Sequence, residues 1–199
     1  MKTKIGIYLA IDTEASGVLP YKNGLIEVAA VVLDKHLNIL DQLVVDIKPP
    51  KSAKFDPEAM KVNGISMERV ENGISYKKFC SAFLKLIKDN FEAKPVIIAQ
   101  FYPFDNAYLV NVFDKAGYSG LNGEILGNDY IDTKSLTNSF NLISRLKGEE
   151  LKYPVTSLSK KGGLKEKFGL NGEQFKSHTA LGDVMMTVEV LKKLLDLEY

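Results

Sequence analysis

The sequence predicts an α/β protein in which a mixed sheet of about five strands is flanked by helices. Two observations predict this class. Three apolar segments rich in β-branched residues follow one another closely, at residues 5–11, 26–33 and 37–47, which is typical of a meander. Two shorter apolar strands, at 96–99 and near 130–131, then alternate with helical patterns. This order indicates one sheet with helices on its faces.

The helices are predicted from their own local signals. Proline in the first turn marks helix starts at Pro57 and Pro103, and the second of these helices runs to Ala116 before a turn at Gly117. Residues 76–90 carry apolar side chains at the spacing of an amphipathic helix. Further helical segments are expected from about residue 133, over about 155–168 and over about 179–197.

The composition of the chain limits the classes of protein to which it can belong. The 199 residues are 45% hydrophobic and 26% charged, so we expect one domain over residues 1–199. A net charge of +1 gives no global attraction to nucleic acid, and any such contact must be local. A single cysteine, Cys80, excludes an internal disulfide and is typical of a reducing compartment. No apolar stretch is long enough for a signal peptide or a membrane span, so we expect a cytoplasmic protein without a membrane partner.

Asp12 and Glu14 stand two residues apart at the end of the first predicted strand. If the strand continues through them, both side chains point to the same face of the sheet. Adjacent carboxylates repel each other unless one is protonated or a divalent cation neutralises both, and Mg²⁺ and Mn²⁺ prefer oxygen ligands. The alternative is a solvated strand end, because an Asp-x-Glu triplet is common by chance.

Asp105 and the segment from His178 to Asp183 supply the other candidates. Asp105 lies in the first turn of a predicted helix, directly after a buried strand, where side chains reach the carboxyl edge of a sheet. An acidic residue there also stabilises the helix dipole without any function. His178 and Asp183 cannot share one helical face, so we expect Asp183 on the last helix and His178 on the preceding loop. In the alternative, Ser177 or Thr179 caps that helix and His178 is merely exposed.

Five short segments are informative as a set because of their order. Residues 11–17 (IDTEASG), 100–105 (QFYPFD) and 178–183 (HTALGD) hold the candidate residues, and 25–29 (LIEVA) and 57–66 (PEAMKVNGIS) lie between them. Together they resemble the DEDDh exonucleases, the branch that includes polymerase proofreading subunits and ribonuclease T. The resemblance spans most of the chain and implies a ribonuclease-H-like mixed sheet of about five strands flanked by helices.

The resemblance implies a metal-dependent 3′→5′ exonuclease that releases 5′-mononucleotides. Asp12 would bridge two divalent cations, Mg²⁺ or Mn²⁺, with Glu14 and Asp183 completing one site. Asp105 would support the second ion, largely through water. His178 would take the proton of the attacking water as general base. All five residues are therefore catalytic candidates, and the four carboxylates are metal-ligand candidates.

The resemblance also implies substrate contacts. The terminal nucleotide would be held by the backbone of four residues, Ala15, Ser16, Gly17 and Val18. Glu58 and Asn63 would lie near its 3′-hydroxyl. Phe101 either stacks on an unpaired base or packs in the core, and the sequence favours neither. The family usually has Gly-His-Asn where this chain has Ala99-Gln100-Phe101, and a histidine is common at the place of Asn63, so substrate preference is open.

The expected partner is single-stranded nucleic acid with a free 3′ end, of DNA, RNA or short oligonucleotides. The resemblance leaves a homodimer and a replication or repair partner open. Two alternatives compete with the exonuclease. One is a catalytically inactive nucleic-acid-binding module of the same fold, which would be expected to have lost an acidic ligand or the histidine. The other is a two-metal phosphohydrolase that acts on short oligonucleotides or nucleotides.

Overall fold

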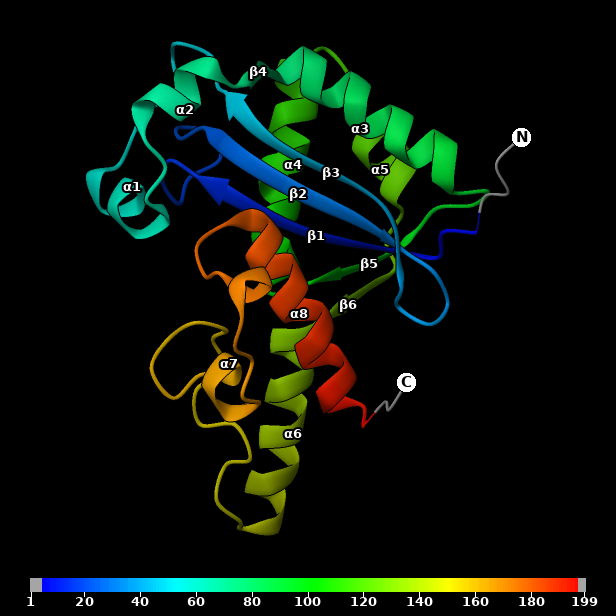
Figure 1. Cartoon of the computed structure of the whole chain (residues 1–199), viewed down its shortest axis with the longest axis vertical. Helices are drawn as coiled ribbons and strands as arrows, with labels where there is room; N and C mark the ends of the chain where they lie inside the picture. The colour runs from blue at the N-terminus through cyan, green and yellow to red at the C-terminus, as the bar shows by residue number, and fades with distance from the viewer. Residues whose placement is uncertain (1–4, 197–199) are drawn as a thin grey trace.

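A six-stranded sheet in the order β4-β3-β2-β1-β5-β6 forms the centre of the computed structural model, which describes residues 5–196 (Figure 1). Strands β1, β2 and β3 form an antiparallel meander, whereas β5 and β6 run parallel to β1 and β4 runs parallel to β3. The predicted mixed sheet is therefore confirmed. The strands span Tyr8–Ala15 (β1), Leu25–Leu33 (β2), Ile39–Lys48 (β3), Ile74–Ser75 (β4), Val96–Ala99 (β5) and Tyr130–Asp132 (β6).

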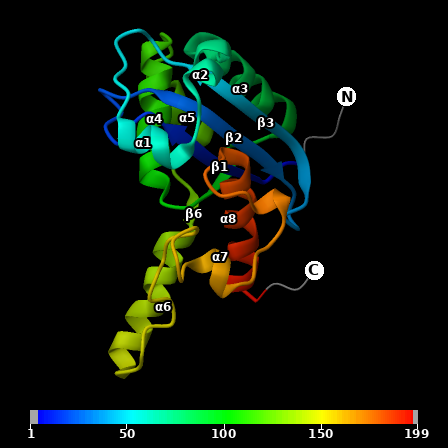
Figure 2. The ribbon, with the colours of Figure 1, turned by 60° about the vertical axis from the view of Figure 1, so that its left-hand side comes forward.

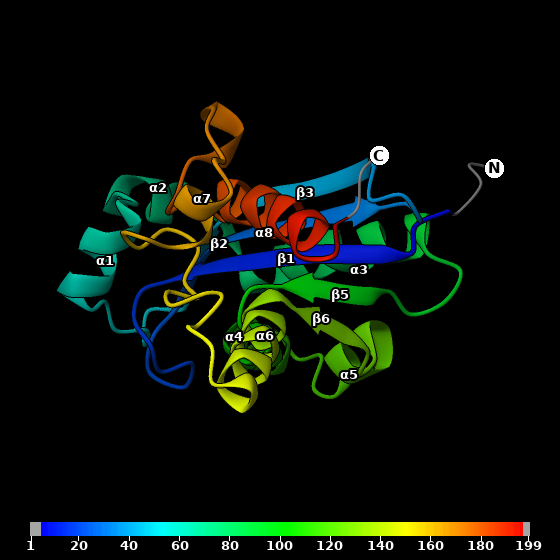
Figure 3. The same cartoon turned by 90° about the horizontal axis from the view of Figure 1, so that it is seen from below.

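Helices cover both faces of the sheet. Helices α3 and α4 pack on one face and α8 on the other (Figure 3), while α6 contacts α8 and projects away from the sheet (Figure 2). No helix within residues 5–196 combines the length and apolarity needed to cross a membrane. The helices span Pro57–Asn63 (α1), Met67–Asn72 (α2), Tyr76–Asn90 (α3), Tyr102–Lys115 (α4), Leu121–Leu126 (α5), Thr133–Lys147 (α6), Leu164–Lys167 (α7) and Ala180–Leu194 (α8), with a 3₁₀ turn at Glu173–Phe175 (η1).

Alternation along β1 decides which face each of its residues meets. Leu9 and Ile11 are buried against α3 and α4, whereas Ala10 between them is buried against α8. Because successive side chains of a strand point to opposite faces, Asp12 and Glu14 fall on the α8 face. The strand thus directs two carboxylates toward the helix that carries the third sequence motif.

The predicted elements differ in how well they match the structure. The helix over residues 76–90 and the strand over 96–99 are confirmed with those bounds. The first strand begins later than predicted, at Tyr8, and continues to Ala15. Helix α8 ends at Leu194, and residue 197, where its end was expected, lies outside the described residues. Helices α2 and α5 and the short strand β4 were not predicted.

The helix predicted over residues 155–168 is wrong. Residues 155–163 form bends, turns and irregular backbone, and only Leu164–Lys167 is helical. Gly162 adopts a left-handed φ of 74°, and a Cβ atom at Gly163 would lie 2.4 Å from the carbonyl oxygen of Ser157. The chain therefore turns back on itself at the two glycines, which prevents a helix through this segment.

Candidate active site

Asp12 and Glu14 lie on the same face of β1. The strand register pairs Asp12 with Ala29 and Glu14 with Glu27 on β2, so the strand continues through both residues. Both side chains are half-buried on the face that α8 covers. The common face expected from their spacing is therefore present.

Asp183 reaches the same place from the first turn of α8. Thr179 caps this helix, and its hydroxyl accepts a hydrogen bond from the Gly182 N–H at 3.2 Å. One carboxylate oxygen each from Asp12, Glu14 and Asp183 lie within 4.8 Å of one another. The Oδ1 atom of Asp183 is buried and has no hydrogen-bond partner within the described part of the chain. These three residues form the carboxylate cluster.

Asp105 lies next to the carboxylate cluster but is not one of its members. It is buried in the first turn of α4, and its Oδ1 accepts a hydrogen bond from the Thr13 hydroxyl at 2.7 Å. Thr13 points to the α4 face of β1, opposite to its neighbours Asp12 and Glu14. Burial raises the pKa of Asp12, and the charge of Asp105 nevertheless raises it further. The structure therefore separates Asp105 from the three carboxylates that it brings together.

His178 lies in the exposed turn that precedes α8. Its φ of 62° is left-handed, a conformation that residues other than glycine seldom adopt. The His178 backbone makes a hydrogen bond with the Asp183 carboxylate, whereas the side chain is exposed. The structure thus brings His178 to the border of the carboxylate cluster, on a loop as its spacing from Asp183 predicted.

Burial and mutual repulsion make these carboxylates weak acids. Burial raises the pKa of Glu14 to about 8, and the charge of Asp183 adds to the shift. Burial also raises the pKa of Asp183 to about 7, against the effect of the His178 hydrogen bond. The pKa of Asp105 is likewise raised by burial to about 7, and that of Asp12 lies well above its usual range. At neutral pH the cluster therefore retains protons or requires a cation.

The carboxylate cluster has the chemistry of a site for a hard divalent cation. All three members offer carboxylate oxygens, which Mg²⁺ and Mn²⁺ prefer as ligands. A cation would neutralise the repulsion that raises the pKa values, and it would supply the missing partner of the Asp183 Oδ1 atom. The residues present therefore fit such an ion.

The melting temperature of the metal-free protein is expected to fall as the pH is raised from about 5 to about 9. The pKa values of Glu14 (about 8) and of Asp183 and Asp105 (about 7) lie above those of the same groups in an unfolded chain. The folded protein therefore holds protons that the unfolded chain has lost, and their stabilising effect disappears as the pH rises through 7 to 8. Thermal unfolding in EDTA across this range measures the effect.

Mg²⁺ is expected to reverse this trend, because a divalent cation at the cluster would bind its deprotonated form and would compete with protons. The rise in melting temperature on adding Mg²⁺ should be larger at high pH than at low pH. Asp183→Asn should flatten the pH dependence in EDTA, whereas Glu92→Gln, which removes an exposed carboxylate at the other end of the sheet, should leave it in place. A melting temperature in EDTA that rises over the same pH range would contradict this account.

Glu27 lies within the segment 25–29, but the sequence assigned it no role at this site. Its buried side chain pairs through Oε1 with Arg69 at 2.7 Å, and its Oε2 accepts a hydrogen bond from the Ala180 N–H at 2.8 Å. Glu27 thus ties β2 to the first residue of the helix that carries Asp183, and Arg69 neutralises its charge. The available signal was a single charged residue in an otherwise apolar strand, because a buried charge requires a partner.

The loop after β1 is held by hydrogen bonds within the protein. The Ser16 hydroxyl is buried and donates to a backbone carbonyl before α1 at 2.8 Å. The Tyr108 hydroxyl, on α4, donates to the Gly17 carbonyl at 2.7 Å. Of the four residues expected to hold a nucleotide, Ala15, Ser16 and Gly17 are buried, and Val18 is exposed. The exposed group that this loop offers to a ligand is therefore the side chain of Val18.

Asn63 and Glu58 occupy different environments on α1. The buried Asn63 amide donates to the Ala15 carbonyl at 3.2 Å, and its side-chain oxygen accepts from the Ile65 N–H at 3.0 Å. Glu58 lies in the first turn of the helix and is exposed. The Asn63 side chain thus holds α1 against the end of β1, whereas the Glu58 carboxylate faces solvent.

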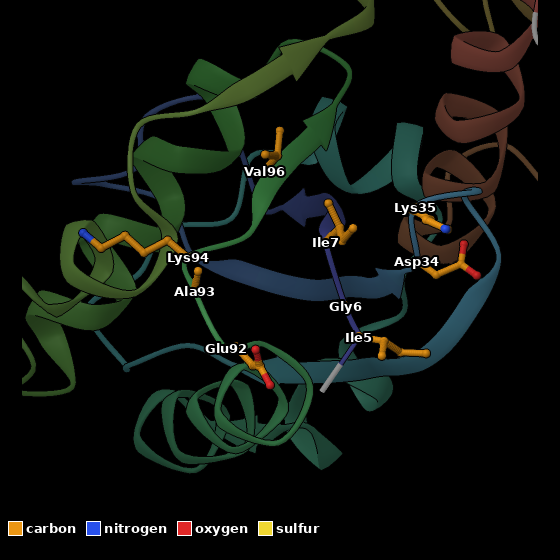
Figure 4. A pocket seen from close by; sticks show the side chains of 9 residues that line it. All are labelled: Ile5, Gly6, Ile7, Asp34, Lys35, Glu92, Ala93, Lys94 and Val96. Atoms are coloured by element: carbon orange, nitrogen blue, oxygen red, sulfur yellow. The ribbon is translucent and has the colours of Figure 1, made fainter. Parts of the chain in front are cut away.

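Gln100 and Phe101 follow β5, on the other side of β1 from β2. They line a cavity of about 550 Å³ that also reaches Asp12 and Asp183. A second cavity, of about 580 Å³, lies at the opposite end of β1 and is lined by Ile7 among others (Figure 4). None of the predicted site residues borders the second cavity, whereas Asp12 and Asp183 of the carboxylate cluster border the cavity at Phe101.

A family model described as RNase_T, Exonuclease, matches residues 9–191. No curated protein matches the chain significantly. Among solved structures, E. coli exonuclease I in complex with a dT13 oligonucleotide has a TM-score of 0.72 at 21% identity, over 94% of this chain and 40% of that chain. The zinc-bound form of the E. coli enzyme with single-stranded DNA has a TM-score of 0.71 at 21% identity, over 95% and 42% of the two chains.

Exonuclease I from Methylocaldum szegediense has a TM-score of 0.73 at 20% identity, over 96% of this chain and 40% of that chain. The chain thus spans less than half the length of these structures. At this level of identity, the similarity shows a shared fold, a mixed sheet with helices on its faces.

Proposed function

Because the chain belongs to the exonuclease family whose model matches residues 9–191, we propose that it is a metal-dependent 3′→5′ exonuclease. The family and the ribonuclease-H-like mixed α/β fold were both expected from the sequence and are confirmed. The observation that carries the proposal is the carboxylate cluster, with three carboxylate oxygens within 4.8 Å and one buried oxygen without a partner. Such a set is suited to hold a divalent cation against a phosphate.

The four carboxylates divide into two roles. Asp12, Glu14 and Asp183 would hold a cation directly, and Asp105 would support a second one through water. When bound, two Mg²⁺ or Mn²⁺ ions stabilise the negative charge that develops on the phosphate oxygens. Glu27 and Arg69 act on this site indirectly, because they fix the start of the helix that presents Asp183.

His178 acts as the general base in this proposal. The imidazole is exposed on its turn, and in this proposal it takes a proton from a water molecule at the border of the cluster while the water oxygen attacks phosphorus. The bond between phosphorus and the 3′-oxygen of the preceding nucleotide then breaks. The departing 3′-oxygen takes up a proton, so the products are a 5′-mononucleotide and a strand with a new 3′-hydroxyl.

The direction of attack depends on which end of the strand the site accepts. Ala15 ends β1, and the loop of Ser16, Gly17 and Val18 follows it, next to α1 with the exposed Glu58. We infer that this side holds the terminal nucleotide, with the Glu58 carboxylate near its 3′-hydroxyl. Asn63 supports the site by fixing α1 to β1.

The test is hydrolysis of a 5′-labelled single-stranded oligonucleotide by the purified chain with Mg²⁺ or Mn²⁺. Removal of nucleotides from the 3′ end is expected to give a ladder of labelled products that shorten stepwise, and EDTA should stop it. Release of the labelled mononucleotide at the earliest times would indicate the opposite direction. Cleavage of a circular single strand would indicate an endonuclease. Either result would overturn the proposal.

Assays with the same purified chain distinguish the exonuclease from two alternative functions. A catalytically inactive binding module would retain the oligonucleotide without shortening it. A small-molecule phosphohydrolase would release inorganic phosphate from a nucleoside monophosphate, and the exonuclease would not. A single-stranded substrate is favoured because E. coli exonuclease I, with which this chain shares its fold, is found in complex with a dT13 oligonucleotide. A homodimer and a replication or repair partner lie beyond this proposal.

A further inference from the structure

Phe101 is held in an unfavourable backbone conformation at the start of α4. Its φ of 68° and ψ of 53° are left-handed, a region in which Gly or Asn is less strained than Phe. The carboxylate of Asp132 maintains this conformation, since Oδ1 accepts from the Phe101 N–H and Oδ2 from the Tyr102 N–H, both at 3.1 Å. A phenylalanine at this position therefore costs stability that a glycine or an asparagine would not cost. Backbone strain that is retained in this way is common at functional sites.

The Phe101 ring is exposed and paired with a cation. Its exposed fraction is 47%, and the Nζ atom of Lys134 lies 4.1 Å from the ring centre. Lys134 is half-buried in the first turn of α6, so the stem of its side chain is fixed while the ammonium reaches over the ring. The pair places an apolar surface and a positive charge side by side, which matches a nucleotide base and its phosphate.

Hydrogen bonds of the Gln100 side chain fix one wall of the cavity beside Phe101 and Lys134. The Gln100 amide donates to the Thr156 carbonyl at 2.8 Å, and the Thr133 hydroxyl donates to the Gln100 side-chain oxygen. Gln100 thereby connects the ends of β5 and β6 to the loop at residues 154–160, which closes the far side of the cavity. A volume of about 550 Å³ lies in the range of small-ligand sites, and Asp12 and Asp183 border the same cavity.

We propose that Phe101 and Lys134 bind the second nucleotide of a single strand, the one that loses the terminal nucleotide. This inference rests on the proposed exonuclease function. The terminal nucleotide is assigned to the loop that leads from β1 to β2, whereas Phe101 follows β5, on the other side of β1. A nucleic-acid strand that crosses the carboxylate cluster from this loop therefore continues along the cavity. Its base stacks on Phe101 and its phosphate approaches Lys134. A base paired within a duplex could not stack there, so the substrate class is unpaired DNA or RNA.

The first test compares two substrates that differ in the second nucleotide. One is a 5′-labelled dT or rU oligonucleotide, and the other is the p-nitrophenyl ester of thymidine 5′-monophosphate, which has no second nucleotide. Phe101→Ala is expected to lower kcat/KM for the oligonucleotide roughly tenfold more than for the ester, because base–aromatic stacking contributes that much. Phe101→Trp should restore the ratio. An equal loss on both substrates, or no loss on either, would overturn the proposal.

Stability provides a second readout that excludes damage to the fold. Phe101→Asn removes the ring but suits the left-handed backbone, so its melting temperature should be a few degrees higher than that of the wild type. Its ratio of oligonucleotide to ester hydrolysis should fall as in Phe101→Ala. Tyr130→Ala is the matched control, because this tyrosine is 50% exposed but lies outside the cavity, and it should keep the ratio. A ratio that falls equally in the control would overturn the proposal.

The role of Lys134 is tested by the salt dependence of binding. The Kd for a fluorescein-labelled dT oligonucleotide is measured with Ca²⁺ in place of Mg²⁺, at several KCl concentrations. Lys134→Met should reduce the slope of log Kd against log salt by about 0.7, the value for one phosphate contact on a single strand. Lys147→Met, at the other end of α6, should leave the slope in place. An unchanged slope in Lys134→Met would remove Lys134 from the proposal.

Binding and hydrolysis together separate the two proposals. A wild-type chain that binds the oligonucleotide but does not shorten it would overturn the exonuclease function. In that case, the Kd values of Phe101→Ala and Lys134→Met would still decide whether the cavity holds a strand. A chain that shortens the oligonucleotide with an unchanged substrate ratio in Phe101→Ala would keep the function and overturn the second-nucleotide site.

Discussion

Asp12→Asn is expected to abolish nuclease activity and, at the same time, to raise the melting temperature of the metal-free protein. The substitution removes one of the three carboxylates that are proposed to hold a cation directly. Loss of about 4 kcal/mol of transition-state stabilisation would already lower kcat/KM roughly a thousandfold. The same change removes one of the charges that repel each other in the carboxylate cluster, whose members have pKa values raised by burial and by one another.

The stability effect is measured by thermal unfolding in EDTA, where an increase of several degrees is expected. Mg²⁺ should raise the melting temperature of the wild type and have little effect on Asp12→Asn. Asp129→Asn is the matched control, since it neutralises an exposed aspartate outside the cluster and should change neither activity nor the response to metal. Substantial activity in Asp12→Asn would refute the assignment of the site. A lower melting temperature in EDTA would refute the repulsion within the cluster.

His178→Gly is expected to lower kcat by about 10² to 10⁴, the usual contribution of a general base, while the response of the melting temperature to Mg²⁺ is kept. Glycine suits the left-handed φ of 62° at this position, so the backbone before α8 should not be disturbed. Single-turnover hydrolysis of the 5′-labelled oligonucleotide measures the chemical step. Imidazole added to the buffer should recover part of the rate, because the vacated space is open to solvent.

Two controls define the result for His178. His36→Ala removes the other of the two histidines, which lies in the turn between β2 and β3, and should leave kcat in place. The melting-temperature shift with Mg²⁺ shows whether the carboxylate cluster is intact. A kcat for His178→Gly close to that of the wild type would show that another group accepts the proton. Loss of the metal response would instead assign His178 to the cation site.

Much of the carboxylate cluster could be predicted from the sequence, because the period of a strand is a local property. The spacing of Asp12 and Glu14 sufficed to place both on one face, and the spacing of His178 and Asp183 sufficed to place Asp183 on α8 with His178 on the preceding loop. The separate position of Asp105 could not be predicted in the same way. It depends on Thr13, which points to the opposite face and donates a hydrogen bond to the Asp105 carboxylate on α4.

Other features depend on contacts between segments that are distant in the sequence, so they could not be predicted from it. Glu27 meets the start of α8 and Arg69 only because the β2 strand and two helices converge. The prediction of a helix over residues 155–168 was wrong because it gave too little weight to the two glycines in this segment. Gly163 packs against the Ser157 carbonyl, where a side chain would not fit. Asn63 was assigned to substrate by resemblance, yet its amide is engaged with Ala15 within the protein.

The carboxylate cluster joins β1, near the start of the chain, to α8, near its end. A cation held by Asp12 and Asp183 would therefore act as a cross-link that closes a loop of almost the whole sequence. Cross-links of long loops restrict the unfolded chain most. We expect the ion to control how often α8 detaches from the sheet, and so to protect the protein from proteolysis as well as to support its chemistry. The cation would then set the lifetime of the folded protein in addition to supporting its reaction.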